Sequence, residues 1–169
     1  MPRYDLYRSV HKFIRREMFQ FGEKLGRTDF RNEEAVTGIT KSFDDLAFDL
    51  TMHARKEEKW FTPLFTSKGS AVCEHTEKDH SDQPDVLAAL QNLFKTALEL
   101  LGSKDVEVQI AQGNHIRSEY DMFLSHNLQH FHEEETVLMP ELWRLYDDAA
   151  LHQVTIDSYK ALPPPVLLD

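Results

Sequence analysis

The stretch from His130 to Pro140 reads HFHEEETVLMP, and the chain has used its pattern once before. The earlier copy is HARKEEKWFTP, from His53 to Pro63. In both copies a Glu stands four residues after the His, and a proline stands ten residues after it. On a helix, side chains at positions i and i+4 share one face, with Cβ atoms about 5–6 Å apart. An imidazole and a carboxylate placed in this way form a ligand pair suited to iron, manganese or zinc.

Apolar residues recur around both copies with the period of about 3.6 residues that marks an amphipathic helix. His53 and Glu57 continue one such apolar stripe, and His130 and Glu134 continue another. The sequence therefore predicts that both His/Glu pairs face inward. The stripes are Ile39, Phe43, Leu46, Leu50, Phe61 and Leu64 for the first pair, and Val106, Ile110, Ile116, Tyr120 and Phe123 for the second.

Residues 4–25 and 71–101 show the same period and predict two further helices. His11 lies on the apolar stripe of the first, and His80 lies on the backward projection of the stripe of the second. Pro84 cannot donate a hydrogen bond to the carbonyl of His80, so a kink or a fresh helix start is expected there. That irregularity leaves His75, five residues before His80, as the alternative inward histidine of this helix.

Four long helices joined by short turns predict an all-α fold, an antiparallel up-down-up-down four-helix bundle. Gly and Pro number only 6 and 7, which favours long helices, and no stretch alternates like a β-strand. We expect the bundle to occupy residues 1–147. Residues 148–169 are expected to form a short C-terminal helix and an extended Pro-rich tail, packed on the bundle or extending from it.

Composition excludes several classes of function. The net charge of −10 argues against a nucleic-acid partner, and no apolar run is long enough to cross a membrane. The N-terminus lacks the apolar core of a signal peptide, and Cys73 is the single cysteine. We therefore expect a cytoplasmic protein without an internal disulfide. The apolar residues of the tail suggest a protein partner or a homo-oligomer.

The inward histidines and glutamates converge on the interior of the predicted bundle. Burying an ionised carboxylate without a partner is very costly, so two of them among four imidazoles require a cation or a set of bound protons. A dinuclear metal centre satisfies all six groups, with the carboxylates able to bridge. Taken singly, any of these residues is better explained as a solvated ion pair. Glu58 and Glu135 point roughly 140° away from their histidines, which predicts surface or supporting positions.

A ferritin-like di-iron bundle would need a Glu-x-x-His motif on two helices, and this chain offers one, Glu77-x-x-His80. The order of motifs instead resembles the hemerythrin-like HHE cation-binding domain over residues 6–146. That resemblance implies a four-helix bundle with a non-haem di-iron site bridged by an oxo or hydroxo group and by carboxylates. The residues carried over as metal ligands are His11, His53, Glu57, His80, His130 and Glu134.

The chain departs from the oxygen carriers of that family on two helices. Those carriers have His-x-x-x-His on the third helix and His-x-x-x-x-Asp on the fourth. Here the third helix has His75 and His80, and Glu replaces Asp on the fourth, with Glu134 preferred as ligand and Glu135 as the alternative. His126, one turn before His130, is a further candidate ligand or a hydrogen-bond donor to one.

The leading hypothesis is a di-iron protein that binds, senses or reacts with O₂, NO or peroxide, rather than a dedicated enzyme. The alternatives are a di-iron oxidase or peroxidase, and a non-redox module for iron sensing or metal storage. Zinc and manganese are the less favoured metals. A metal-free helical interaction domain is the fourth hypothesis. Tyr7 and Tyr120 are expected near the core, as packing residues or as part of the lining of the site.

Overall fold

The computed structural model describes residues 2–103 and 105–161, and every regular element in these ranges is a helix. The prediction of an all-α protein is thus confirmed for the part of the chain described. Four helices are long: α1 (Arg8–Arg27), α2 (Glu33–Trp60), α4 (Glu74–Leu100) and α5 (Val106–Glu133). The shorter elements are α3 (Thr62–Thr66), the π-helical segment η1 (Glu134–Leu138), α6 (Met139–Leu145) and α7 (Asp148–Lys160).

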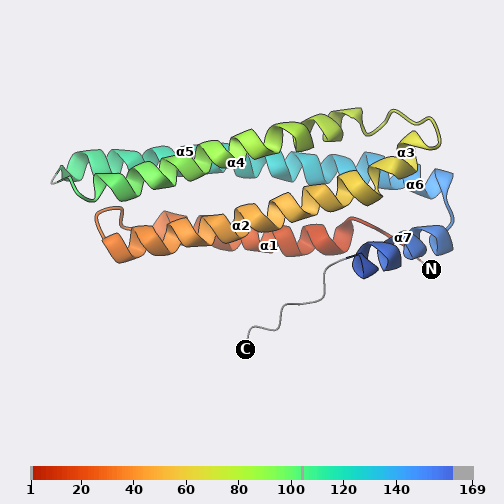
Figure 1. Ribbon diagram of the computed structural model, residues 1–169, viewed down its shortest axis with the longest axis horizontal. Helices are drawn as coiled ribbons and strands as arrows, with labels where there is room; N and C mark the ends of the chain where they lie inside the picture. Colours follow the sequence, from red (N-terminus) through yellow and green to blue (C-terminus); the bar gives the residue numbers. More distant parts are fainter. Residues whose placement is uncertain (1, 104, 162–169) are drawn as a thin grey trace.

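Figure 1 shows the four long helices side by side as a bundle. The α1–α2 and α4–α5 connections lie at one end, and the α2–α4 connection through α3 lies at the other. Helix α2 contacts α1 and α4, and α5 contacts the same two helices, so the four enclose one interior.

Side-chain caps fix where several helices begin. Asn32 accepts a hydrogen bond from the N–H of Ala35 before α2, and Asp105 caps α5 in the same manner. The first helix begins at Arg8, later than the residue 4 expected from its apolar period. The Asp5 carboxylate accepts hydrogen bonds from the backbone N–H groups of Tyr7 and Arg8, and it acts as the start signal.

The buried apolar residues form two separate clusters along the bundle. The larger cluster fills the end that contains Phe21, Phe43 and Phe94. The smaller cluster lies at the opposite end and joins residues of α3, α6 and α7, among them Phe65, Leu142 and Leu151, to the start of α1. The buried histidines and glutamates lie on each helix between residues of these two clusters. A polar layer therefore crosses an otherwise apolar interior.

Prolines have different effects at different positions. Helix α4 passes Pro84 without interruption, so the fresh helix start expected there does not occur. Pro84 is exposed, and the helix forgoes one hydrogen bond while the ring faces solvent. Near Pro140, by contrast, the helix widens: the N–H of Met139 bonds to the carbonyl of Glu134, five residues back. Near Pro63, α2 ends and α3 begins.

Helix α7 packs against the end of the bundle that holds the smaller cluster. Leu151 is fully buried there, and the Arg3 guanidinium bonds to Asp148 and to the carbonyls of Trp143 and Tyr146. Helix α7 lies within the range, residues 148–169, in which a C-terminal helix was expected. The Pro-rich tail, residues 162–169, lies outside the described residues. Among the helices described, none has the length and apolar composition needed to cross a membrane.

Two glycines give opposite predictions for alanine substitution. A Cβ at Gly113 would lie 2.6 Å from Cγ of the buried Phe30 ring, whereas a Cβ at Gly38 would meet nothing within 4 Å. Gly113→Ala should lower the free energy of unfolding by about 1–3 kcal/mol through overpacking. Gly38→Ala, the matched control inside α2, should raise it by about 0.5–1 kcal/mol. Urea unfolding measures both, and equal effects would contradict the close packing of α5 against Phe30.

Candidate metal centre

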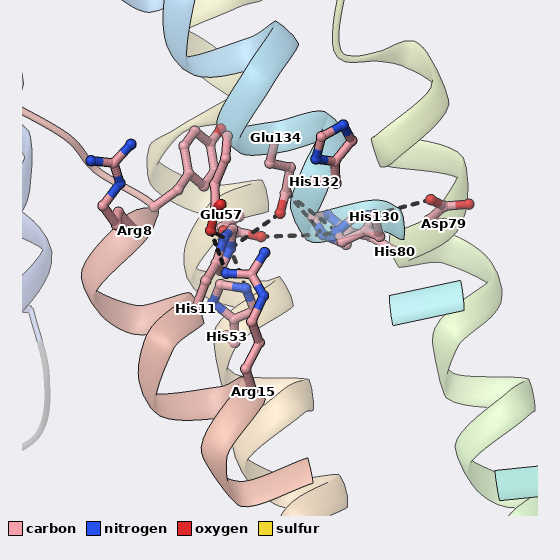
Figure 2. Close-up of polar contacts among 12 residues, drawn as sticks. Arg8, His11, Arg15, His53, Glu57, Asp79, His80, His130, His132 and Glu134 are labelled. Atoms are coloured by element: carbon pink, nitrogen blue, oxygen red, sulfur yellow. Dashed lines mark hydrogen bonds and ion pairs between the residues drawn. The ribbon is translucent and has the colours of Figure 1, made fainter. Parts of the chain in front are cut away.

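The structure brings together all six side chains that the sequence singled out as ligands. They come from four helices and the π segment, and Figure 2 shows them converging inside the bundle. All are buried, with exposed fractions between 0% for His11 and 6% for His53, His80 and His130. The ligand atoms form two quartets, His11/His53/Glu57/Glu134 and Glu57/His80/His130/Glu134, and within each quartet they lie within 4.8 Å of one another.

The first quartet lies between α1 and α2. Glu57 Oε1 is 3.3 Å from His53 Nε2 and 3.6 Å from His11 Nε2. Glu134 Oε2 reaches the same His11 nitrogen at 3.2 Å. Two imidazoles and two carboxylate oxygens therefore face one point, a donor set suited to a first-row transition metal.

The second quartet uses the other oxygen of each carboxylate. Glu57 Oε2 lies 3.2 Å from His80 Nε2, and Glu134 Oε1 lies 3.3 Å from His130 Nε2. The two Nε2 atoms of His80 and His130 are 3.1 Å apart. Both glutamates thus present one oxygen to each quartet, which is the arrangement of two bridging carboxylates between two cations.

Buried polar atoms without hydrogen-bond partners indicate whether metal ions would fit among these residues. Within the described part of the chain, seven buried side-chain atoms have no hydrogen-bond partner, and all seven belong to these residues. They include both oxygens of Glu57 and both ring nitrogens of His53. Several of these atoms lie 3.2–3.6 Å from an oppositely charged or chargeable group yet form no hydrogen bond with it. Since burying such atoms unpaired costs about 1–3 kcal/mol each or more, cations between them fit the site.

Two further carboxylates orient one histidine in each quartet. His11 Nδ1 is 3.0 Å from Glu135 Oε1, and His130 Nδ1 is 3.0 Å from Asp79 Oδ2. A carboxylate on the outer ring nitrogen holds the imidazole so that its other nitrogen faces a metal. Glu135 is itself bound by Arg15 at 2.6 Å, whereas Asp79 lies 3.5 Å from His126 Nε2.

The structure places the three alternative ligand candidates outside the cluster. His75 has a side chain 62% exposed, and its Nδ1 is 2.9 Å from Glu133. Because α4 is continuous, the five-residue step from His80 turns His75 away from the interior. His126 is 61% exposed and approaches Asp79 rather than the quartets. Glu135 faces the outer nitrogen of His11, a supporting position.

The π segment explains why the two copies of the motif differ. Glu58 and Glu135 each stand five residues after the motif histidine, yet Glu58 is exposed in regular α-helix. Glu135 lies in the wider turn of η1, and its carboxylate reaches His11 on a neighbouring helix. An inserted wide turn re-aims side chains and is frequent at functional sites. The proline at the tenth position is the sequence signal for it, although its outcome differs in α2.

Aromatic rings enclose the first quartet. Phe131 stacks on His11 with ring centroids 4.4 Å apart, and Tyr7 lies 5.5 Å from the same ring. Phe131 comes from α5 and His11 from α1, so their contact is not encoded in the spacing of either helix. Tyr120 is a packing residue: its hydroxyl donates to the carbonyl of Met18 at 2.6 Å.

The pKa shifts within the site favour bound protons when no metal is present. Burial lowers the pKa of His11, but the carboxylates of Glu134 and Glu57 outweigh it and raise that pKa to about 9. Burial also opposes charge on His130, and Glu134 and Asp79 likewise raise its pKa to about 9. Burial raises the pKa of Glu57, yet the surrounding histidines bring it well below its ordinary value. Burial lowers the pKa of His53, which favours a neutral ring.

These shifts predict how the stability of the metal-free protein depends on pH. The raised pKa values of His11 and His130 give stability that is complete below pH 6.5 and is lost as the pH rises through about 9. Urea unfolding of the chelator-treated protein should show this fall, roughly 1.4 kcal/mol per pH unit for each histidine. His130→Gln should flatten the dependence. A free energy of unfolding that is constant from pH 6.5 to 9 would contradict the proton-filled site.

The sequence of this chain is similar to those of known proteins. The sequence profile of the Hemerythrin HHE cation binding domain matches residues 3–142, a range that includes all six clustered residues. F-box/LRR-repeat protein 5 of Xenopus laevis is 25% identical over 145 residues, which cover 84% of this chain and 20% of that protein. The chain thus spans about a fifth of the length of this relative. No solved structure matches the chain significantly. On the extent of the profile match, the chain belongs to the hemerythrin HHE cation-binding domain family.

Proposed function

We propose that this chain is an up-down-up-down four-helix bundle that holds two iron ions and binds or senses a small ligand, O₂, NO or peroxide. The observation that carries the proposal is the pair of quartets that share both oxygens of Glu57 and of Glu134. A surface ion pair needs no such sharing. Two cations spaced by bridging carboxylates do.

Iron is the metal that we propose for this donor set. Each quartet supplies two neutral imidazoles and two carboxylate oxygens, a mixture that suits iron and is shared by zinc and manganese. Two bridging glutamates offset two positive charges, so each divalent ion keeps net positive charge and attracts a further small ligand. Bound iron would supply the affinity for that ligand and the capacity to exchange electrons with it.

The protein's own residues would select and enclose the ligand. Phe131 and Tyr7 keep the His11 quartet dry, and burial raises the pKa of Tyr7 well above its ordinary value, so its phenol stays protonated. Apolar surroundings favour a small neutral molecule over a charged reductant. Glu135 and Asp79 hold His11 and His130 in orientation while a ligand comes and goes.

A second candidate function is iron sensing through folding. The six polar groups separate the two apolar clusters, so their charges are balanced only when cations or protons fill the site. Binding energy for the metal then becomes folding energy for the chain. In this role, loss of iron would loosen the bundle and change the surface that it presents to a partner protein. A di-iron oxidase or peroxidase is the enzymatic alternative.

Glu57→Gln tests the bridging role directly. The amide keeps the shape but offers one acceptor oxygen and no charge, so one quartet loses its Glu57 ligand and the other keeps only a neutral one. Metal affinity should fall at least about 100-fold, more than loss of a supporting partner costs. The measurement is iron content after anaerobic reconstitution with Fe²⁺, and Glu58→Gln, its exposed neighbour, is the matched control. If Glu57→Gln retained two iron ions per chain, the bridging assignment would be wrong.

Ligand binding and turnover are separable on the same iron-loaded protein. Gas binding predicts a change in the absorption spectrum on addition of O₂ or NO that reverses when the gas is removed. An oxidase or peroxidase predicts steady consumption of O₂ or peroxide with an added reductant. Iron sensing predicts neither, but a large drop in the unfolding midpoint after iron removal.

A further inference from the structure

A small cavity lies between α4 and α5, against the second quartet. Its volume is about 40 Å³, and its lining includes Asp79, His80, Val86, Phe123, His126 and His130. A cation in this cavity would thus contact two of the proposed ligands, His80 and His130. The exposed side chains of His126 and Val86 stand at its outer side.

The cavity lining carries a graded series of cation ligands. His126 is 61% exposed, Asp79 is 14% exposed, and His130 is 5% exposed. His126 Nε2 lies 3.5 Å from Asp79 Oδ1, and Asp79 Oδ2 lies 3.0 Å from His130 Nδ1. His80 also lines the cavity and is only 6% exposed. Its Nδ1 has no hydrogen-bond partner among the described residues. These ligands lead from solvent to the site.

The approaches to the first quartet carry the opposite charge. Arg15 lies behind His11, where it binds Glu135, and the guanidinium sits 5.4 Å from the centre of the Phe131 ring. A wider groove beside His53 is lined by Arg55, Lys56 and Lys59. Arg15 is neutralised by Glu135, and the groove beside His53, which also contains Asp49, keeps a net positive charge that repels a divalent cation. Asp79 and Asp82 at the α4–α5 cavity attract one.

We propose that divalent cations reach and leave the metal centre through the α4–α5 cavity, with Asp79 and His126 as their first ligands. This inference rests on the proposed metal-binding function and adds its route. Asp79 then has two roles: it receives the cation, and it orients His130 once the ion has passed inward. The bulk of the side chain at position 86 and the charge at position 82 set the rate of passage without supplying a ligand to the final site.

Uptake and release of Co²⁺ by the full chain test the route. Metal-free protein is mixed with Co²⁺ and followed by its visible absorption, and the loaded protein is then mixed with excess EDTA. Val86→Trp places an indole at the cavity and should slow both processes roughly tenfold, as when passage must await a local opening. It should still bind two equivalents. The matched control is Met52→Trp, at the groove beside His53, which should change neither rate.

Asp82→Asn separates charge from obstruction. Removal of this carboxylate should slow uptake about two- to threefold at low ionic strength, and the difference should fade at high salt. The route is wrong if Val86→Trp matches the wild type in both rates, or if Met52→Trp is the variant that slows them. If the wild type binds no Co²⁺ at all, the proposed metal centre fails together with the route. If it binds two equivalents at unchanged rates in Val86→Trp, the route alone fails.

Discussion

Two carboxylates buried in an apolar bundle are the constraint on which the rest of this structure depends. Glu57 and Glu134 are at most 2% exposed, and neither forms an ion pair with a lysine or an arginine within residues 2–103 and 105–161. Their charge is met by imidazoles alone, which are neutral unless protonated. An isolated buried charge costs far more than a bundle of this size has in net stability, so something positive must fill the layer. Without metal, protons can supply this charge, and cations in the two quartets would supply it through the inner ring nitrogens and the carboxylate oxygens. Each side chain around the layer follows from that requirement.

Regular helices supply most of the polar side chains in this layer, and the π segment η1 after α5 is the irregular turn among them. Helices α1 and α4 bring one histidine each from unbroken turns, and α2 brings a His/Glu pair before it ends at Trp60. After α5, the π segment η1 begins at Glu134 itself. The second glutamate of that motif copy, Glu135, therefore turns inward to reach His11. A regular helix would have left it exposed, as Glu58 is. The irregular turn therefore adds a supporting carboxylate that the repeated motif alone does not supply.

The helical period was enough to predict the all-α fold and the inward facing of the six clustered residues, because burial follows a period that sequence spacing records directly. Groups placed by contacts between helices could not be predicted in the same way. Asp79 stands next to His80 and was overlooked, since its partner, His130 Nδ1, is on another helix. Phe131 likewise stacks on His11 of another helix, α1, a contact that the period of α5 alone does not reveal. The continuity of α4 through Pro84 depended on the ring facing solvent, which the spacing of one proline does not reveal.

The two halves of the site share their bridging ligands but not their surroundings. In the His11 half, Phe131 stacks on His11 and Arg15 neutralises the supporting carboxylate, Glu135, while His53 lines a wider groove. The His80 half borders a smaller cavity, and its supporting carboxylate, Asp79, is bonded to His130 and lies beside the exposed His126, with no lysine or arginine among its described contacts. A cation in the first half would therefore lie among balanced charges, while one in the second half would lie close to the carboxylates of Asp79 and Asp82. Identical ligand sets then need not give identical affinities or exchange rates. The outer residues, rather than the ligands themselves, would then favour retention in one half and exchange in the other.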